Sequence, residues 1–217
     1  MVIEPIFERE FAGHSYGFRP GRGCKDALRR VDELLRSGLT HVVDVDIKGY
    51  FDNIPQDQLL ALVKHKISDK RILGMLGKFL RQGVMEGMNG WQPTASGTPQ
   101  GAIISPLLAN IYLDPLDHLM AAKGWEMTRY ADDFIIQCET QAEALAALAQ
   151  VETWMAEAGL TLHPEKTRGV DATRKGGFEF LSWHFERGYK WPRRKSIQKL
   201  KDSVRARTKR NNGHDMC

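Results

Sequence analysis

The stretch Tyr130-Ala131-Asp132-Asp133 places two adjacent carboxylates between two apolar segments. Trp125 and Met127 alternate with other residues before it, and Phe134-Ile135-Ile136 follows, which predicts a strand, a tight turn and a second strand. Neighbours along a strand point to opposite faces, so only a turn brings both acids to one point. Such carboxylates repel each other unless a cation lies between them, which predicts a divalent metal site with oxygen ligands, most simply for Mg²⁺. The alternative is an acidic hairpin tip in water, because Asp is a favoured turn residue.

A third carboxylate is predicted at the end of the β-branched segment of residues 41–48. Asp44 and Asp46 share one face of this predicted strand, and Val43, Val45 and Ile47 share the other face. A carboxylate at the end of a buried strand is costly unless a metal or a base holds it. Asp46 is therefore expected to join the pair at 132–133, and Asp44 is the weaker candidate.

Composition sets broad limits. The 217 residues are 42% hydrophobic, which is enough for one large domain with a packed core. No apolar run approaches the ~18 residues of a membrane helix, and the N-terminus lacks the pattern of a secretory signal. Cys24, Cys138 and Cys217 are odd in number and widely spaced, so a reducing compartment and a cytoplasmic location are expected.

The charge is unevenly distributed along the chain. Residues 186–217 hold eleven Lys and Arg against three Asp and Glu, a net charge of +8, whereas residues 1–185 carry −4. A basic C-terminal arm beside a body with an acidic centre favours a polyanionic partner. The alternative is a solvated tail.

The first glycine-rich segment covers Ser15–Gly23 and contains two arginines. It predicts a loop whose backbone approaches a phosphate chain, with Arg19 and Arg22 as charge partners. The alternative is a surface turn anchored by Tyr16 and Phe18.

The second glycine-rich segment, Gly97–Pro106, leads into a predicted helix capped by Ser105. A helix N-terminus attracts anions, so Gln100 and the loop backbone are expected to lie against a substrate. An ordinary loop into a well-capped helix explains the same residues.

Apolar periodicity predicts the remaining elements. Helices are predicted over 27–35, over 58–80 in two pieces joined near Ser68-Asp69, and over 107–120 with a kink or restart at Asp114-Pro115. A further helix is predicted over 141–155, after a capping box at Thr140–Glu143. A strand or hairpin over 177–185 and a cationic helix that begins near Arg193 follow.

Six blocks of this sequence together resemble reverse transcriptases of the kind encoded by bacterial group II introns. They occur in the order of that family and cover most of residues 3–185. The blocks are Ser15–Arg22, Val43–Ile54, Gly97–Pro106 through Asn110, Tyr130–Asp133, Leu162–Thr167 and Phe180–Phe185.

The resemblance implies an α+β fold, the right-hand polymerase palm, in which helices back an antiparallel sheet. It also implies partial fingers over 1–38, a palm with a fingers insertion over 39–185, and the basic start of a helical thumb over 186–217. The implied reaction is RNA-directed DNA synthesis, in which a two-metal site transfers the nucleotidyl group of a dNTP onto a primer 3′-hydroxyl, with pyrophosphate as the leaving group and RNA as the template. Two Mg²⁺ ions are the implied cofactors, with Mn²⁺ as the other ion that such sites accept.

The resemblance also assigns roles to single residues. Asp46, Asp132 and Asp133 match the catalytic, metal-binding triad, and Ile47 matches the position whose backbone carbonyl helps to hold a metal.

For the nucleotide, Phe51 matches the aromatic residue that excludes a ribose 2′-hydroxyl, while Gln100 and Lys166 match positions near the incoming dNTP. The residues expected to contact template or primer are Arg19, Arg22, Gly101, Arg193, Arg194 and Lys195.

Three functions are compatible with this core. The first is the polymerase, whose expected partners are an RNA template (an intron RNA), a DNA primer and dNTPs, with no membrane. The others are a maturase-like RNA-binding splicing cofactor and a stand-alone reverse transcriptase of phage defence or CRISPR adaptation. The family's first fingers blocks would precede Met1 and its thumb would continue past Arg210. The isolated chain is therefore expected to bind primer–template weakly, with low or no activity.

Overall fold

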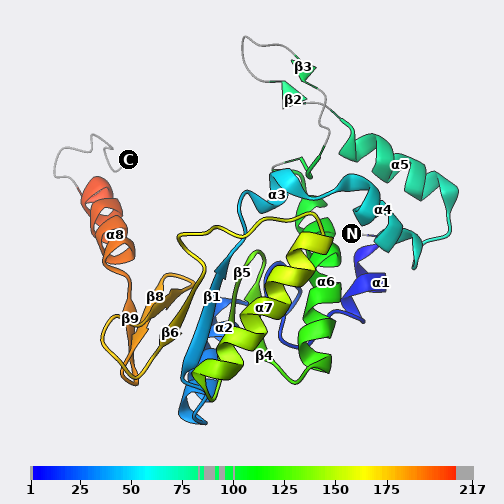
Figure 1. The fold of residues 1–217 in the computed structure, drawn as a ribbon. Coiled ribbons are helices and arrows are strands. Elements are labelled where there is room, and N and C mark those ends of the chain that lie inside the picture. Colours follow the sequence, from blue (N-terminus) through cyan, green and yellow to red (C-terminus); the bar gives the residue numbers. More distant parts are fainter. Residues whose placement is uncertain (1, 83, 86–90, 93–95, 100, 209–217) are drawn as a thin grey trace.

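A four-stranded antiparallel sheet forms the centre of the molecule (Figure 1). The computed structural model describes residues 2–82, 84–85, 91–92, 96–99 and 101–208. The sheet has the order β4-β5-β1-β6, and its strands are β1 (His41–Asp46), β4 (Glu126–Tyr130), β5 (Asp133–Cys138) and β6 (Arg168–Asp171). β1 lies between β5 and β6, so segments far apart in sequence meet there.

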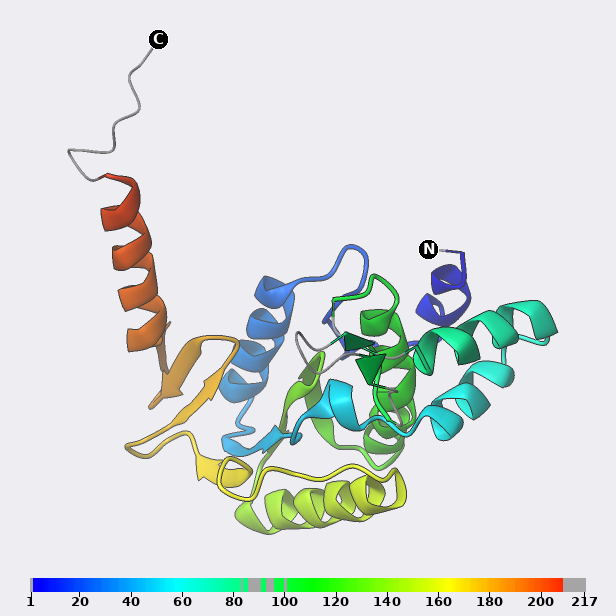
Figure 2. The same cartoon turned by 90° about the horizontal axis from the view of Figure 1, so that it is seen from above.

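The alternation of side chains along β1 gives the sheet two different covered faces. Val43 and Val45 pack in one core with α6 (Ser105–Ala122) and α7 (Gln141–Glu157). Val42 packs in a second core with α2 (Cys24–Arg36) and the sheet of β7 (Phe178–Phe180), β8 (Trp183–Glu186) and β9 (Tyr189–Pro192). Figure 2 shows α2 and α7 on opposite sides of the sheet. The predicted division of this strand into two faces is confirmed.

Helix α6 crosses the sheet without interruption. It runs through Pro115 as one helix, so the predicted restart at that residue is wrong. A proline inside a helix costs about 3 kcal/mol, and the complete burial of Leu113 and Leu116 on either side offsets that cost. The predicted cap is also wrong by one residue. Ile104 is the N-cap, and the Ser105 hydroxyl donates to the carbonyl of Pro99 at 2.6 Å.

The other helices follow the sequence pattern. The Thr140 hydroxyl caps α7 by accepting from the Glu143 backbone N–H at 3.2 Å. Asp69 caps the second of two helices where the sequence predicts a break. These and the remaining elements are α1 (Glu4–Glu8), α3 (Tyr50–Asn53), α4 (Gln56–Lys64), α5 (Lys70–Leu80), β2 (Val84–Met85), β3 (Trp91–Gln92) and α8 (Arg194–Arg207).

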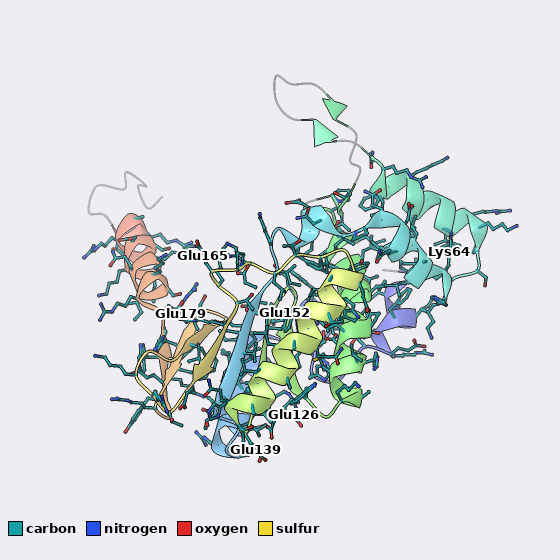
Figure 3. All side chains as sticks on the ribbon, viewed as in Figure 1. Lys64, Glu126, Glu139, Glu152, Glu165 and Glu179 are labelled. Carbon is teal, nitrogen blue, oxygen red and sulfur yellow. The ribbon has the colours of Figure 1, made fainter. Side chains whose placement is uncertain are left out.

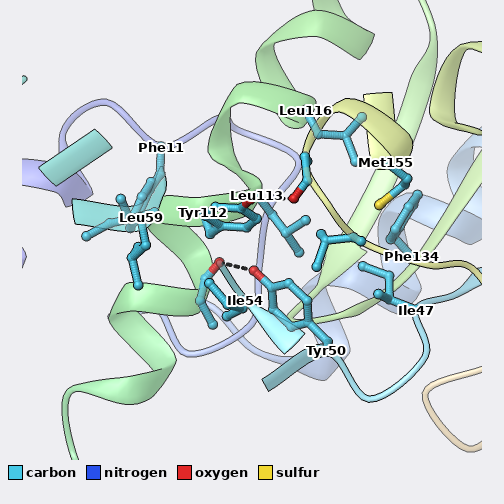
Figure 4. Packing of buried hydrophobic residues seen from close by; sticks show 14 of the residues in the cluster. Phe11, Ile47, Tyr50, Ile54, Leu59, Tyr112, Leu113, Leu116, Phe134 and Met155 are labelled. Atoms are coloured by element: carbon cyan, nitrogen blue, oxygen red, sulfur yellow. Dashed lines mark hydrogen bonds between the residues drawn. The ribbon is translucent and has the colours of Figure 1, made fainter. Parts of the chain in front are cut away.

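The short helix α3 is fixed against α6 by a buried tyrosine. The Tyr50 hydroxyl donates to the carbonyl of Ala109 at 2.6 Å, within a core that includes Ile54 and Leu113 (Figure 4). A buried hydroxyl that keeps its hydrogen bond costs little and fixes one geometry. The chain just past the end of β1 is therefore rigidly placed.

The basic helix α8 projects away from the rest of the molecule (Figure 2). None of its residues is buried, and its apolar Leu200 is 65% exposed. The predicted cationic helix is present, and its side chains face solvent. Within the described part of the chain, no helix combines the length and apolarity needed to cross a membrane.

Candidate active site

The three predicted carboxylates meet at one end of the central sheet. Asp46, the last residue of β1, lies opposite Asp133, the first residue of β5. Asp133 also pairs with Tyr130 at the end of β4, so Ala131 and Asp132 form the turn between these strands. Ala131 takes a left-handed φ of 60° to make this turn, which is uncommon for a residue with a Cβ. The predicted strand–turn–strand is present.

These acids line one open cavity of about 570 Å³. It receives side chains from both sheets and from the loop after α7. The lining residues are Asp44, Val45, Asp46, Ile47, Asp132, Asp133, Glu165, Lys166, Arg168, Glu179, Leu181, Ser182 and Arg193. Asp44 and Asp46 point to the α2 side of the sheet, as their parity predicts, so the cavity opens beside the second core.

Burial and the neighbouring negative charges raise the pKa values of three carboxylates in the cavity. Burial, and then the charges of Asp44 and Asp132, raise the pKa of Asp133 to about 7. Burial raises the pKa of Asp44 to about 6, against the neighbouring Arg168. Burial and the charge of Asp46 also raise the pKa of Asp132. Raised values of this kind are typical of functional sites, where a ligand supplies the missing positive charge.

Basic side chains border the cavity. The ammonium of Lys166 lies 3.0 Å from Asp46 Oδ2. Arg193 donates to Glu179 at 3.0 Å, and the guanidinium of Arg168 is 3.9 Å from Asp44. These side chains offset part of the acidic charge at the rim.

The hairpin turn between β7 and β8 closes one side of the cavity. Leu181 and Ser182 both have positive φ, 47° and 70°, as a two-residue turn of the I′ type requires. The Leu181 backbone N–H hydrogen-bonds the carboxylate of Asp133 and lowers its pKa, against the larger effect of burial. This turn therefore contacts the acidic centre through its backbone.

Carboxylate oxygens are the type of donor that hard divalent cations prefer. Within the described ranges, however, no group of three or more His, Cys, Asp or Glu side chains is arranged so that it could hold a metal ion by itself. Mg²⁺ is commonly held by one or two carboxylates, with water and substrate phosphates completing its shell. Carboxylates that do not by themselves complete a coordination shell, and whose pKa values are raised, suit this way of binding Mg²⁺. Ile47 lines the cavity while its side chain is buried in the core, so its backbone faces the cavity.

Two of the three predicted nucleotide residues, Phe51 and Lys166, lie around the end of β1. Phe51, half-buried in α3, accepts from the Thr98 backbone N–H at 2.8 Å through its carbonyl. Gly97 lies so close to Phe51 that a Cβ added to Gly97 would be 2.6 Å from the carbonyl oxygen of Phe51. The second glycine-rich loop is thus docked on α3. Gln100 lies outside the described residues.

Arg19 requires a correction. It is only 7% exposed, and its guanidinium donates to the Glu8 carboxylate at 3.0 Å and to the carbonyls of Ala12 and Ser15 at 2.6 and 2.9 Å. Arginine offers a fixed fork of donors, and here the fork is directed into the protein. The expected contact of Arg19 with template is contradicted by this placement.

The other residues expected to contact nucleic acid are at the surface. Arg22 donates to the Gly13 carbonyl at 2.5 Å and lies over the ring of Tyr16. Gly101 is exposed and has a φ of 80°. Three basic residues line a second cavity of about 520 Å³ next to Trp191 and His184; they are Arg193, Arg194 and Lys195.

Two acids of the site were missed by the sequence reasoning. Glu165 and Glu179 line the cavity, and Figure 3 labels both side chains. The signal for Glu179 was available, because it alternates with Phe178 and Phe180 and so faces away from the core.

Comparison with known proteins agrees with this geometry. The family model described as "Reverse transcriptase (RNA-dependent DNA polymerase)" matches residues 1–185. The chain is 45% identical over 119 residues to the group II intron-encoded protein LtrA of Lactococcus lactis, covering 54% of this chain and 19% of LtrA. It is 44% identical over 120 residues to an uncharacterized 91 kDa protein in the cob intron of Schizosaccharomyces pombe, covering 55% of this chain and 15% of that protein.

The fold has relatives among solved structures. Telomerase from Candida albicans, in complex with a fragment of telomeric RNA, superposes with a TM-score of 0.69 at 12% identity and covers 95% of this chain and 42% of that one. This confirms the predicted polymerase palm and fingers fold. The matched segments span less than a fifth of the two sequence relatives. The family match covers more than half of this chain, which therefore belongs to the reverse transcriptase (RNA-dependent DNA polymerase) family.

Proposed function

We propose that the protein is an RNA-directed DNA polymerase of the group II intron type. The observation that carries this proposal is the meeting of Asp46 with Asp132 and Asp133 at the end of one sheet, in an open acidic cavity. Family membership supports the reaction class, and the similarity to LtrA supports the intron type. The proposed cofactors are two Mg²⁺ ions, and Mn²⁺ is the proposed substitute.

The proposed chemistry assigns the acids a binding role. Asp46, Asp132, Asp133 and the Ile47 carbonyl would hold the two ions. When bound, paired divalent ions activate a primer 3′-hydroxyl and stabilise a leaving pyrophosphate. The chain itself positions these oxygens, and Lys166 supplies a cation beside them. Such transfer needs positioned charge and little other chemistry from the protein.

The proposed substrates are a dNTP, a DNA primer and an RNA template, with an intron RNA as the proposed natural template. The basic residues beside Trp191 suit a nucleic-acid backbone, since cations bind phosphates and aromatic rings stack on bases. We also propose the division into fingers (1–38), palm (39–185) and the start of a thumb (186–217).

The test is single-nucleotide addition to a DNA primer annealed to RNA, with protein in excess over primer–template. We expect Mg²⁺-dependent addition of the nucleotide complementary to the template base. Addition that proceeds equally well without Mg²⁺ or Mn²⁺ would contradict the polymerase proposal.

Phe51→Ala is expected to relax the choice of sugar. If Phe51 lies under the ribose, removing its ring opens space for a 2′-hydroxyl, and the preference for dNTP over rNTP should fall by about tenfold or more. The measurement is kcat/KM for a matched dNTP and rNTP pair. Phe79→Ala, which alters a partly buried phenylalanine of α5, is the control and should leave the ratio unchanged. An unchanged ratio in the Phe51 variant would remove Phe51 from the nucleotide site.

Lys166→Met is expected to change metal and nucleotide binding in opposite directions. In the metal-free protein the Lys166 ammonium pairs with Asp46, and both side chains are partly exposed, 57% and 40%. Pairs of this exposure are weak, so removing the lysine should tighten Mn²⁺ binding by about twofold to fivefold. The KM for dNTP should rise by about five- to tenfold, because a phosphate partner is lost. Lys64→Met on α4 (Figure 3) is the control. Weaker binding of both ligands would contradict the competition between Lys166 and metal.

A further inference from the structure

A buried ion pair lies directly under the turn that carries Asp132. Arg129 and Asp117 both have side chains with 0% exposure. The Arg129 Nε donates to Asp117 Oδ1 at 2.8 Å, and Nη2 donates to Oδ2 of the same carboxylate. A bidentate pair of this kind is strong and directional. It fixes the plane of the Arg129 guanidinium relative to helix α6.

The remaining nitrogen of that guanidinium contacts the catalytic turn itself. Arg129 Nη1 donates to the carbonyl of Ala131 at 2.9 Å and to Asn110 Oδ1 at 2.9 Å. Ala131 is the residue with positive φ that lets Asp132 project between β4 and β5. A strained residue persists only where its surroundings determine it, and this hydrogen bond is such a constraint.

The first glycine-rich loop completes the support. Asn110 Nδ2 donates to the Gly17 carbonyl at 2.8 Å. The backbone of Arg129 donates to the His14 carbonyl at 3.0 Å and accepts from the Tyr16 N–H at 2.9 Å. A Cβ on Gly17 would lie 2.3 Å from the Ala131 nitrogen and 2.9 Å from the Tyr130 carbonyl carbon. The loop therefore touches the catalytic turn, and its glycine is required by contact with protein backbone.

We propose that Arg129, Asp117, Asn110 and Gly17 are positioning residues that set the placement of Asp132 and thereby the affinity of the site for divalent cations. This inference rests on the proposed function of the acidic cavity. In this proposal, the first glycine-rich loop holds the turn of Ala131 and Asp132 in place by packing against its backbone. None of the four residues needs to touch metal or substrate, because each acts through the Ala131 backbone.

The first test is the double variant Arg129→Met with Asp117→Leu. Replacing both members of a buried ion pair by apolar residues is often neutral for stability, whereas removing one member is costly. The double variant removes the bond to Ala131 without leaving one charge unpaired. We expect a melting temperature close to that of the wild type and Mn²⁺ affinity weakened by about tenfold, measured by electron paramagnetic resonance without dNTP or nucleic acid.

Gly17→Ala is the second test, because it leaves the ion pair intact. Its new methyl group must push the turn away, so we expect a similar loss of Mn²⁺ affinity. Leu80→Ala is the matched control. Leu80 is fully buried in α5, so its truncation lowers the melting temperature but should leave Mn²⁺ affinity unchanged.

The outcomes separate positioning from stability. Wild-type Mn²⁺ affinity in Gly17→Ala, or in a folded double variant, would overturn the proposal. A loss of Mn²⁺ affinity in Leu80→Ala equal to the loss in Gly17→Ala would also overturn the proposal, because Mn²⁺ affinity would then follow stability alone. The readout needs no DNA synthesis, so a negative primer-extension result and a negative result in this test are distinguishable. Failure of Asp132→Asn to weaken Mn²⁺ binding would instead refute the metal site itself.

Discussion

Asp132→Asn is expected to reduce single-nucleotide addition by about 1000-fold, which corresponds to about 4 kcal/mol of transition-state stabilisation. Asparagine has nearly the same size as aspartate and fits the same turn, so the change removes charge without removing volume. Asp132 faces Asp46 and Asp133 in the cavity. Without its charge, the remaining carboxylates would hold the ions of the reaction more weakly.

The measurement is single-turnover primer extension at saturating protein, with Asp57→Asn as the control. The Asp57 side chain on α4 is 96% exposed, so the control makes the same chemical change away from the cavity. We expect its rate to equal that of the wild type. A rate for Asp132→Asn within tenfold of the wild type would mean that Asp132 does not bind a catalytic ion.

Asp133→Asn is expected to stabilise the metal-free protein at pH 8. Burial and the charges of Asp44 and Asp132 raise the pKa of Asp133 to about 7, above the ordinary value near 4. A raised carboxyl pKa leaves stability intact below pH 4 and removes it as the pH rises toward and through 7. The gain at pH 8 should be about 4 kcal/mol, or about 8–16 °C in melting temperature.

The check is thermal unfolding in EDTA between pH 4 and pH 8. The advantage of Asp133→Asn should vanish near pH 4 and grow with pH, whereas Asp57→Asn should track the wild type throughout. Adding Mg²⁺ should stabilise the wild type increasingly from pH 6 to pH 8, because the ion competes with protons for Asp133. The variant should respond less. A variant that is less stable than the wild type at pH 8 would show that the charge of Asp133 does not destabilise the folded protein when no metal is present.

Local sequence predicted the strands and the turn that bring Asp46, Asp132 and Asp133 together, but it did not predict that Glu165 and Glu179 line the same cavity. The parity of β1 placed Asp44 and Asp46 on one face, and this holds because side chains of a strand alternate strictly. The turn at Ala131–Asp132 was predicted from the adjacent carboxylates and the apolar segments beside them. Helix α7 begins at the predicted cap because Thr140 and Glu143 bond locally.

Tertiary contacts decided what local sequence could not. Pro115 signals a break, but burial on both sides of it keeps α6 continuous. Arg19 has the charge of an RNA contact, yet Glu8 and nearby carbonyls hold it inside. The role of Arg129 depends on Asp117 and Asn110, and their pairing across the fold has no local signature.

The most direct test of the central claim is Mn²⁺ binding to the wild type, Asp46→Asn and Asp132→Asn, with and without a dNTP. Asp46 ends β1 and Asp132 lies in the turn between β4 and β5, so the two aspartates are far apart in sequence, yet both line one cavity. The account predicts that the wild type binds Mn²⁺ and binds it more tightly when dNTP phosphates are present, and that either substitution weakens binding in both conditions. Equal Mn²⁺ binding by all three proteins would contradict it.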